Sequence, residues 1–273
     1  MSIGRQIRVG ALLLGIVLLI ALVGPLFGRH DPRALVGPVY GSPAPGAPLG
    51  FDYLGHDVLS RVLAGGRSVV WMALAAAAIA LAIGTALGLI AGYGHRRVDQ
   101  LIVWSADVFH AFPSLILVLL VVSVLGRDKG LIVLTAALAL VPGVVRLVRG
   151  LTVGVASQEF VEAAEMLGVS RARIRLREIL PNISTPLLVH LGTMLAWAVG
   201  ILSALSFLGY GVAPPAADWG LMINENRAGL QVQPWAVLVP AAVIAAFTLG
   251  ANLLADGLGR AQARIGAAGA GPG

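Results

Sequence analysis

The sequence predicts an all-α membrane protein with six transmembrane helices. Of its 273 residues, 58% are hydrophobic and only 12% are charged, whereas roughly a quarter are charged in ordinary soluble domains. Its apolar runs reach the ~20 residues that a helix needs to cross ~30 Å of hydrocarbon. Each span must be helical, because lipid offers the backbone no hydrogen-bonding partner. The chain has no cysteine, which excludes disulfides and thiolate metal sites.

The predicted spans follow the ends of the apolar runs. The first is expected to remain as an anchor, because no small-residue cleavage site follows Phe27. The second contains Gly84 and Gly88, a spacing of small residues that lets membrane helices approach closely. The six spans are Val9–Phe27, Ser68–Tyr93, Val98–Leu125, Gly130–Val145, Leu187–Tyr210 and Trp235–Ala255.

The third and fourth spans are less regular than the others. Asp107, His110 and Pro113 interrupt the third, and Pro142-Gly143 predicts a kink or an end in the fourth. A carboxylate costs ~2.5–3.5 kcal/mol at the centre of a span. Two interpretations of Asp107 therefore stay open: a proton relay with His110, or a structural carboxylate paired inside the bundle.

The basic residues predict the orientation. With the N-terminus inside, twelve of the nineteen basic residues lie on the cytoplasmic side, and the positive-inside rule then places both termini in the cytoplasm. The twelve are Arg5, Arg8, Arg96, Arg97, Arg146, Arg149, Arg171, Arg173, Arg175, Arg177, Arg260 and Arg264. In the outer segments, Trp219 and Trp235 are interpreted as interface anchors, with a docking role as the alternative.

Several function classes find no support in the sequence. The net charge of +6 comes from arginines scattered between apolar spans, without the stripe that nucleic-acid binding requires. The five histidines share no metal-binding spacing, and we expect no catalytic or metal site. No G-x-x-x-x-G-K-[ST] loop exists, and Lys129 is the only lysine. The chain is thus expected to hold no cofactor, and its energy must come from a partner or an ion gradient.

One densely charged segment, EAAEMLGVSRARIRLREILPN from Glu162 to Asn182, separates the fourth and fifth spans. In its first arm Phe160, Ala163, Ala164 and Leu167 have the i, i+3, i+4, i+7 spacing of one helical face. Gly168 follows the last of them, where a left-handed residue would end the helix.

The second arm is ambiguous. Ser170 can cap another helix, which should stop before Pro181. The four arginines from Arg171 to Arg177, however, alternate with apolar residues at the period of a strand. A cytosolic helix that binds a protein groove and a solvated loop on anionic lipid are equally compatible with this pattern.

This segment carries a resemblance to a known family. Glu162-Ala163-Ala164, then Gly168, then Ile179-Leu180-Pro181 resemble the EAA loop of ABC importer permeases, although Glu178 stands where that family has an aliphatic residue. LGHDVLSRVLAGGRSV from Leu54, FPSL from Phe112, LSFLGYGVAPPAADWG from Leu205 and NLLADGLG from Asn252 occur in the order found in C-type permeases of dipeptide, oligopeptide and nickel importers. Phe51 and His56 depart from the Thr and Arg common there.

The resemblance implies a type I ABC importer permease fold and a function. The chain would form half of the translocation pathway for dipeptides or short oligopeptides in the plasma membrane of a prokaryote. Its expected partners are a second, B-type permease, two cytoplasmic ATPase subunits or domains that bind ATP and Mg²⁺, an extracytoplasmic binding protein and membrane lipid. The residues expected to couple it to the ATPase are Glu162, Ala163, Ala164, Leu167, Gly168 and Pro181.

The expected organisation has three parts: an anchor helix with an extracytoplasmic loop (1–67), a transmembrane domain (68–260) with the EAA loop at 157–181, and a disordered tail (261–273). Two alternatives to peptide import stay open. One is a permease of the same family for nickel or another small solute. The other is a secondary transporter driven by protons through Asp107, although such carriers usually show an internal repeat of spans.

Overall fold

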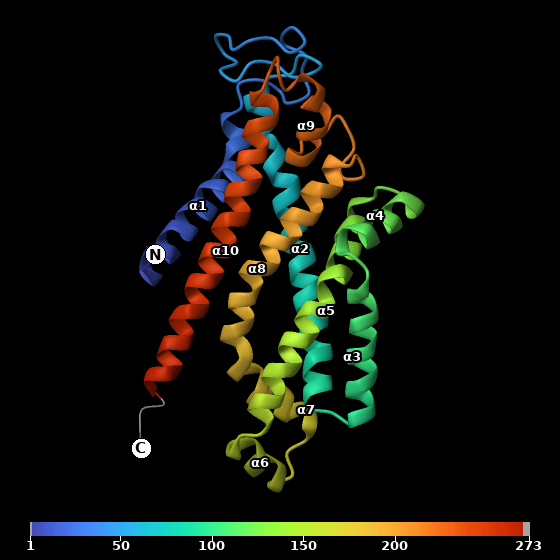
Figure 1. The fold of residues 1–273 in the computed structure, drawn as a ribbon, viewed down its shortest axis with the longest axis vertical. Coiled ribbons are helices and arrows are strands. Elements are labelled where there is room, and N and C mark those ends of the chain that lie inside the picture. The colour runs from blue at the N-terminus through green and yellow to red at the C-terminus, as the bar shows by residue number, and fades with distance from the viewer. Residues whose placement is uncertain (1, 270–273) are drawn as a thin grey trace.

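The computed structural model describes residues 2–269, and within them every regular element is helical (Figure 1). Outside the helices of this part, the only β-bridges are two isolated ones, Ala44 with Ala47 and Phe51 with Asp57. The elements are α1 (Ile3–Val23), the 3₁₀ turn η1 (Gly24–Phe27), α2 (Val58–Gly92), α3 (Arg96–Ala111), α4 (Ser114–Leu125), α5 (Lys129–Ala156), α6 (Glu159–Met166), α7 (Arg171–Arg173), the π-helical turn η2 (Ile174–Ile179), α8 (Leu180–Phe207), α9 (Trp219–Asn226), the 3₁₀ turn η3 (Arg227–Gly229) and α10 (Trp235–Gly269).

Five of the six predicted spans are continuous helices, and the third is broken. Within the described residues, α1, α2, α5, α8 and α10 are long and apolar enough to cross a membrane. The third span bends by 80° between α3 and α4. Phe112 is extended there (φ −87°, ψ 131°), because the ring of Pro113 disfavours a helical conformation in the residue before it. The break leaves α4 at the edge of the bundle, beside the upper part of α5 and pointing away from the other helices (Figure 1).

Two predicted boundaries are wrong. Helix α2 begins at Val58, so the predicted division at residue 67 falls inside it. Its cap is Asp57, whose carboxylate accepts from the Leu59 and Ser60 N–H groups. Helix α5 passes through Pro142 and continues to Ala156 instead of ending near Val145, because its packing against α2 supports both sides of the proline.

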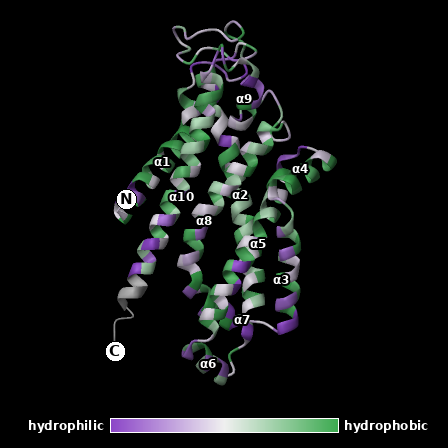
Figure 2. Ribbon diagram, viewed as in Figure 1, coloured by the Kyte–Doolittle hydropathy of each residue, from purple (hydrophilic) through white to green (hydrophobic). Residues whose placement is uncertain are grey.

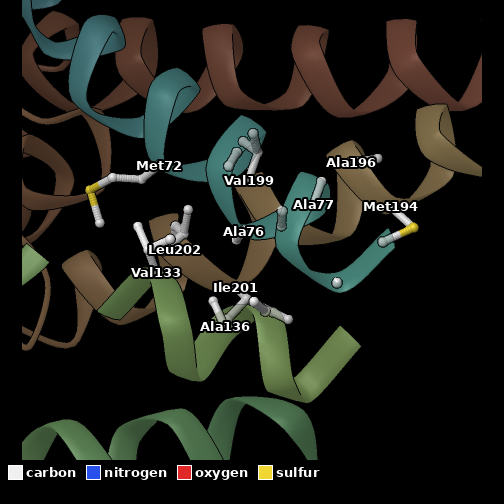
Figure 3. Packing of buried hydrophobic residues seen from close by; sticks show 14 of the residues in the cluster. Met72, Ala76, Ala77, Val133, Ala136, Met194, Ala196, Val199, Ile201 and Leu202 are labelled. Carbon is white, nitrogen blue, oxygen red and sulfur yellow. The ribbon is translucent and has the colours of Figure 1, made fainter. Parts of the chain in front are cut away.

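That packing rests on glycine, as Gly84 and Gly88 predict. A Cβ atom on Gly84, Gly88 or Gly92 would lie 2.5–2.6 Å from the Cβ of Val144, Val148 or Thr152, respectively. Both sets recur every four residues, so one face of α2 lies directly on one face of α5. The core beside them is also built from small side chains, including Ala76, Ala136 and Val199, drawn from α2, α5 and α8 (Figure 3).

The two terminal helices run side by side at one edge of the bundle (Figure 1). They approach closely where a Cβ on Gly10 would lie 2.6 Å from the Leu254 nitrogen. Farther along, Gly257 lies against Ile7 in the same way. Helix α10 continues to Gly269, so residues 261–269 of the predicted tail are helical. Residues 270–273 lie outside the described residues.

Candidate functional site

The charged segment forms a hairpin at one end of the bundle, next to the turn between α2 and α3 (Figure 1). Its arms are α6 and the continuous helix made of α7, η2 and α8. Hydrophobic residues are concentrated along the long helices, whereas hydrophilic residues mark α6 (Figure 2). The hairpin therefore lies beyond the apolar part of the spans.

Gly168 ends the first arm, as the sequence predicts. Its φ of +72° is left-handed. The Gly168 N–H donates to the Glu165 carbonyl at 2.9 Å, and the Val169 N–H donates to the Ala164 carbonyl at 3.1 Å. These two bonds form a Schellman motif, which satisfies the last carbonyls of the helix.

The apolar residues of α6 are divided between two faces, which corrects the single predicted face. Val161 is fully buried and Ala164 packs against the bundle core. Phe160, Ala163 and Leu167 point outward, and Leu167 is 82% exposed. Helix α6 is thus held to the bundle by one side and presents apolar side chains on the other.

A hydrogen bond fixes the position of α6. The hydroxyl of Tyr93, directly after α2, donates to the carboxylate of Glu165. Burial of the phenol, together with this carboxylate, raises the pKa of Tyr93 to about 12. The contact connects the first arm to the end of α2.

The second arm is helical, so of the two open interpretations the solvated loop is wrong. The prediction that this helix stops before Pro181 is also wrong. Residues Arg171–Phe207 form one run of 37 residues, in which η2 ends at Ile179, two positions before Pro181. A π-helical turn widens the backbone, which accommodates a residue that lacks an N–H. The alternation of arginines does not produce a strand, because the bundle buries Ile174 and Ile179 at helical positions.

At the opposite end, residues 28–57 and α9 form a cap around a buried arginine. The Arg61 guanidinium donates to the Asp52 carboxylate at 2.6 Å and to the Glu225 carboxylate at 2.9 Å. His56 Nδ1 lies 2.9 Å from the same Asp52 carboxylate. The hydroxyl of Tyr53 completes the group by donating to Glu225 at 3.1 Å. Loop, helix α2 and helix α9 are therefore joined by charge-assisted hydrogen bonds.

The pKa values of the two buried carboxylates are shifted in opposite directions. Burial raises the pKa of Glu225, and Arg61 offsets this only in part. Burial also tends to raise the pKa of Asp52, but the N–H groups of Leu54 and His56 and the Arg61 charge outweigh it and hold that pKa below its usual value. Asp52 is thus the stable anionic partner of Arg61.

Both departures from the family pattern, Phe51 and His56, lie in the cap and make contacts there. The Phe51 ring lies against Gly37, where an added Cβ would come within 2.5 Å of it, and His56 bonds Asp52. Trp219 is neither an interface anchor nor exposed for docking. It is fully buried, and its Nε1 donates to the Val62 carbonyl at 2.8 Å.

Asp218, the N-cap of α9, makes the cap sensitive to pH. Burial raises the pKa of this carboxyl to about 6. The folded state then holds the proton more tightly than the unfolded state, so stability falls as the pH rises from about 4 through about 6. Wild type should be less stable at pH 7.5 than at pH 5 by about 1–2 kcal/mol from this group. Asp218→Asn, which can still cap the helix, should lose this difference. Melting temperatures of both proteins at the two pH values test it, and equal pH dependence would contradict it.

Two ion pairs connect α3 with α5. Arg149 makes a two-pronged contact with Asp99, at 2.5 and 2.7 Å. Arg146 donates to Asp107 at 2.6 Å. Asp107 is therefore paired, as its structural interpretation predicts. The pair lies at the bundle surface rather than inside the bundle, because the Asp107 side chain is 53% exposed. Among the described residues, no three His, Asp or Glu side chains gather as a metal site would need.

Comparison with known proteins identifies the family. Residues 84–264 match the family described as the binding-protein-dependent transport system inner membrane component. The chain belongs to this family. The predicted type I ABC importer permease fold is thereby confirmed, and the chain is a multi-pass membrane permease rather than an enzyme.

The permease is similar to several curated proteins over most of its length. A dipeptide transport system permease protein (DppC) of Alkalihalophilus pseudofirmus is 35% identical, with 92% of this chain and 83% of the relative covered. A DppC of Haemophilus influenzae is 34% identical, with 93% and 88% covered. A glutathione transport system permease protein (GsiD) of Pectobacterium atrosepticum is 35% identical, with 77% and 70% covered.

The six predicted coupling residues do not lie on one surface. Glu162, Ala163, Leu167 and Gly168 are exposed at the tip of the hairpin. Ala164 faces the bundle, and Pro181 lies in the first turn of α8. Sequence reasoning missed Tyr93 and Val161, which hold the hairpin in place. It also missed Arg61, whose position among the apolar residues Val58, Val62 and Val69 was the available signal.

Proposed function

We propose that the permease is one transmembrane subunit of an ATP-driven importer of dipeptides or short peptides. Membership of the family establishes a transport subunit. The names of the DppC relatives favour peptide cargo. The GsiD relative is named for glutathione, which is itself a short peptide. Nickel is less well supported, because no site with three metal ligands occurs among the described residues.

The hairpin is the proposed contact with a cytoplasmic ATPase, and its geometry is the observation that carries the proposal. Met166 and Leu167 are 83% and 82% exposed beyond the apolar part of the bundle. Exposed apolar side chains rimmed by charged residues mark protein interaction sites. Glu162, Ala163, Leu167 and Gly168 form the contact surface, whereas Ala164 and Pro181 hold it in place. An amphipathic helix in a groove is a recurring mode of recognition.

The second arm transmits movement into the membrane. Because α7, η2 and α8 form one continuous helix, a displacement of the hairpin moves the far end of α8. Helix α6 is connected to α2 through Tyr93, so both arms act on long helices. ATP-driven closure of the partner would thus rock the bundle between inward-facing and outward-facing states.

The proposed assembly contains the partners that this chain lacks. A second, B-type permease completes the pathway, two ATPase subunits or domains bind ATP and Mg²⁺, and a binding protein delivers cargo to the outer cap. The chain itself holds no cofactor. The distribution of arginines supports a cytoplasmic location for both termini and the hairpin in the plasma membrane of a prokaryote.

Uptake into vesicles tests this function against the proton-driven carrier. The complex, purified with its own partners, should take up radiolabelled dialanine when ATP and the binding protein are present. The permease alone, given a proton gradient without ATP, should take up none. Asp107→Asn should leave the pH dependence of uptake unchanged, because Asp107 pairs with Arg146 rather than carrying protons. Proton-driven uptake by wild type that this variant abolishes would contradict the proposal.

A further inference from the structure

Two adjoining cavities lie beside the break between α3 and α4. The smaller, of about 200 Å³, is lined from α3, α4, α5 and α8 and includes His110, His190 and Trp197. The larger, of about 410 Å³, is lined from α4, α8 and α10 and includes Trp197 and Asn252. Trp197 and Ile201 border both cavities. The two cavities therefore adjoin along α8, and together they are called the hollow.

Most residues that line the hollow are apolar or small, and its polar members include His110, His190 and Asn252. His110 lies at the end of α3, about 21 Å from its start at 1.5 Å per residue, and within the third predicted span (98–125). Asp107 lies one helical turn before His110 on α3 and pairs with Arg146 of α5. Arg146 lies one helical turn after Gly143, which lines the smaller cavity. The paired groups are roughly half exposed on the isolated chain.

Lipid is a poor neighbour for such groups. A charged or polar side chain in hydrocarbon costs several kcal/mol unless it faces protein or water. By contrast, every residue of α1 from Val9 to Val23 is apolar or glycine, so the exposed surface of this part of α1 is apolar. The two surfaces are thus chemically distinct, although Trp197 is 65% exposed and Leu12, on α1, is 64% exposed.

We propose that this permease contributes one wall of the translocation pathway at the hollow, and that this wall fits a zwitterionic peptide. The side chains that line the wall are Asp107, His110, Arg146, His190, Trp197 and Asn252. This proposal rests on the proposed function. An imidazole N–H donates to a cargo carboxylate, and the Trp197 ring attracts a cargo ammonium group. Because α8 continues into the second arm of the hairpin, movement at the hairpin shifts His190 and Trp197 relative to the other residues of the wall.

Cysteine labelling tests the wall, and the chain is suited to it because it has no cysteine of its own. The variants are Trp197→Cys and His190→Cys, with Leu12→Cys as the control of matched exposure. Each is expressed in its own membrane with its partners and treated with a membrane-impermeant methanethiosulfonate that carries a sulfonate. Only a thiolate reacts, and a thiol in apolar surroundings has a raised pKa.

The expected result is labelling of residues 197 and 190 at least about tenfold faster than of residue 12, since a pKa raised by one unit lowers the thiolate fraction tenfold. The rates at 197 and 190 should also differ between nucleotide-free and vanadate-trapped complexes. Labelling of all three variants after denaturation confirms that the thiols are present. Rates as slow as at residue 12 in both states would overturn the proposal.

A second readout separates this proposal from the proposed function. Modification of Trp197→Cys should block ATP-driven uptake of radiolabelled dialanine, whereas the same treatment of Leu12→Cys should not. Uptake that persists after complete labelling of residue 197 would overturn the wall. If the unmodified wild-type complex takes up no dialanine, the peptide cargo is wrong, whereas the labelling pattern still decides whether these residues face a water-filled pathway.

Discussion

Gly168→Val is expected to abolish ATP-driven uptake while the permease still inserts and assembles. Gly168 has a φ of +72°, and the space where a Cβ would lie is open. The cost therefore comes from the backbone alone, at roughly 1–2 kcal/mol, and a β-branched residue fits this conformation worst. The strain is relieved by unwinding the Schellman motif, which changes the angle between the arms of the hairpin. Uptake and stimulated ATP hydrolysis should fall together in a reconstituted complex.

Gly168→Asn is the matched control. Asparagine adopts the left-handed conformation more readily than other non-glycine residues, and no neighbour obstructs its side chain within 4 Å of the Cβ position. It should retain most of the uptake that valine abolishes. If both variants couple ATP hydrolysis to uptake normally, the assignment of this hairpin to the ATPase contact is wrong. If the hairpin binds lipid instead, removing two of its exposed arginines, such as Arg171 and Arg173, should have the larger effect.

Arg61→Met is expected to destabilise the outer cap strongly. The side chains of Arg61 and Asp52 are at most 2% exposed, and Glu225 is 7% exposed. Methionine replaces most of the volume but leaves two buried carboxylates without their cation. Removing one partner of a buried ion pair typically costs ~3–5 kcal/mol. A large fall in melting temperature and loss of the purified complex should follow.

Arg67→Met is the control for this prediction, because Arg67 stands in the same helix but is exposed. A surface substitution of this kind usually changes stability by less than ~0.5 kcal/mol. Similar melting temperatures for Arg61→Met and wild type would show that the buried ion pairs do not stabilise the cap. A comparable loss in both variants would point to net charge rather than to the buried contact.

The sequence by itself determined the membrane class, the helical content and the position of the hairpin. Hydrocarbon demands about twenty apolar residues per span and leaves the backbone no alternative to a helix. The membrane class, the helical content and the position of the hairpin therefore follow from the lengths and order of the apolar and charged runs. The left-handed conformation of Gly168 was predictable for another reason, because a local backbone constraint does not depend on distant residues. The spacing of Gly84 and Gly88 also predicted close packing, because only small residues permit it.

Only the tertiary structure decided which side chains face each other. In the sequence Arg61 resembles any arginine of an outer segment. Folding brings the carboxylates of Asp52 and Glu225 to its guanidinium, and Glu225 is 164 positions away in the chain. The sequence likewise left the second arm open between a helix and a solvated loop, because alternating arginines have the period of a strand, and the burial of Ile174 and Ile179 against the bundle decides for the helix. Asp107 acquired its partner in the same way, from α5. Local constraints act within a few residues, whereas burial and charge pairing depend on distant segments that meet only in the folded chain.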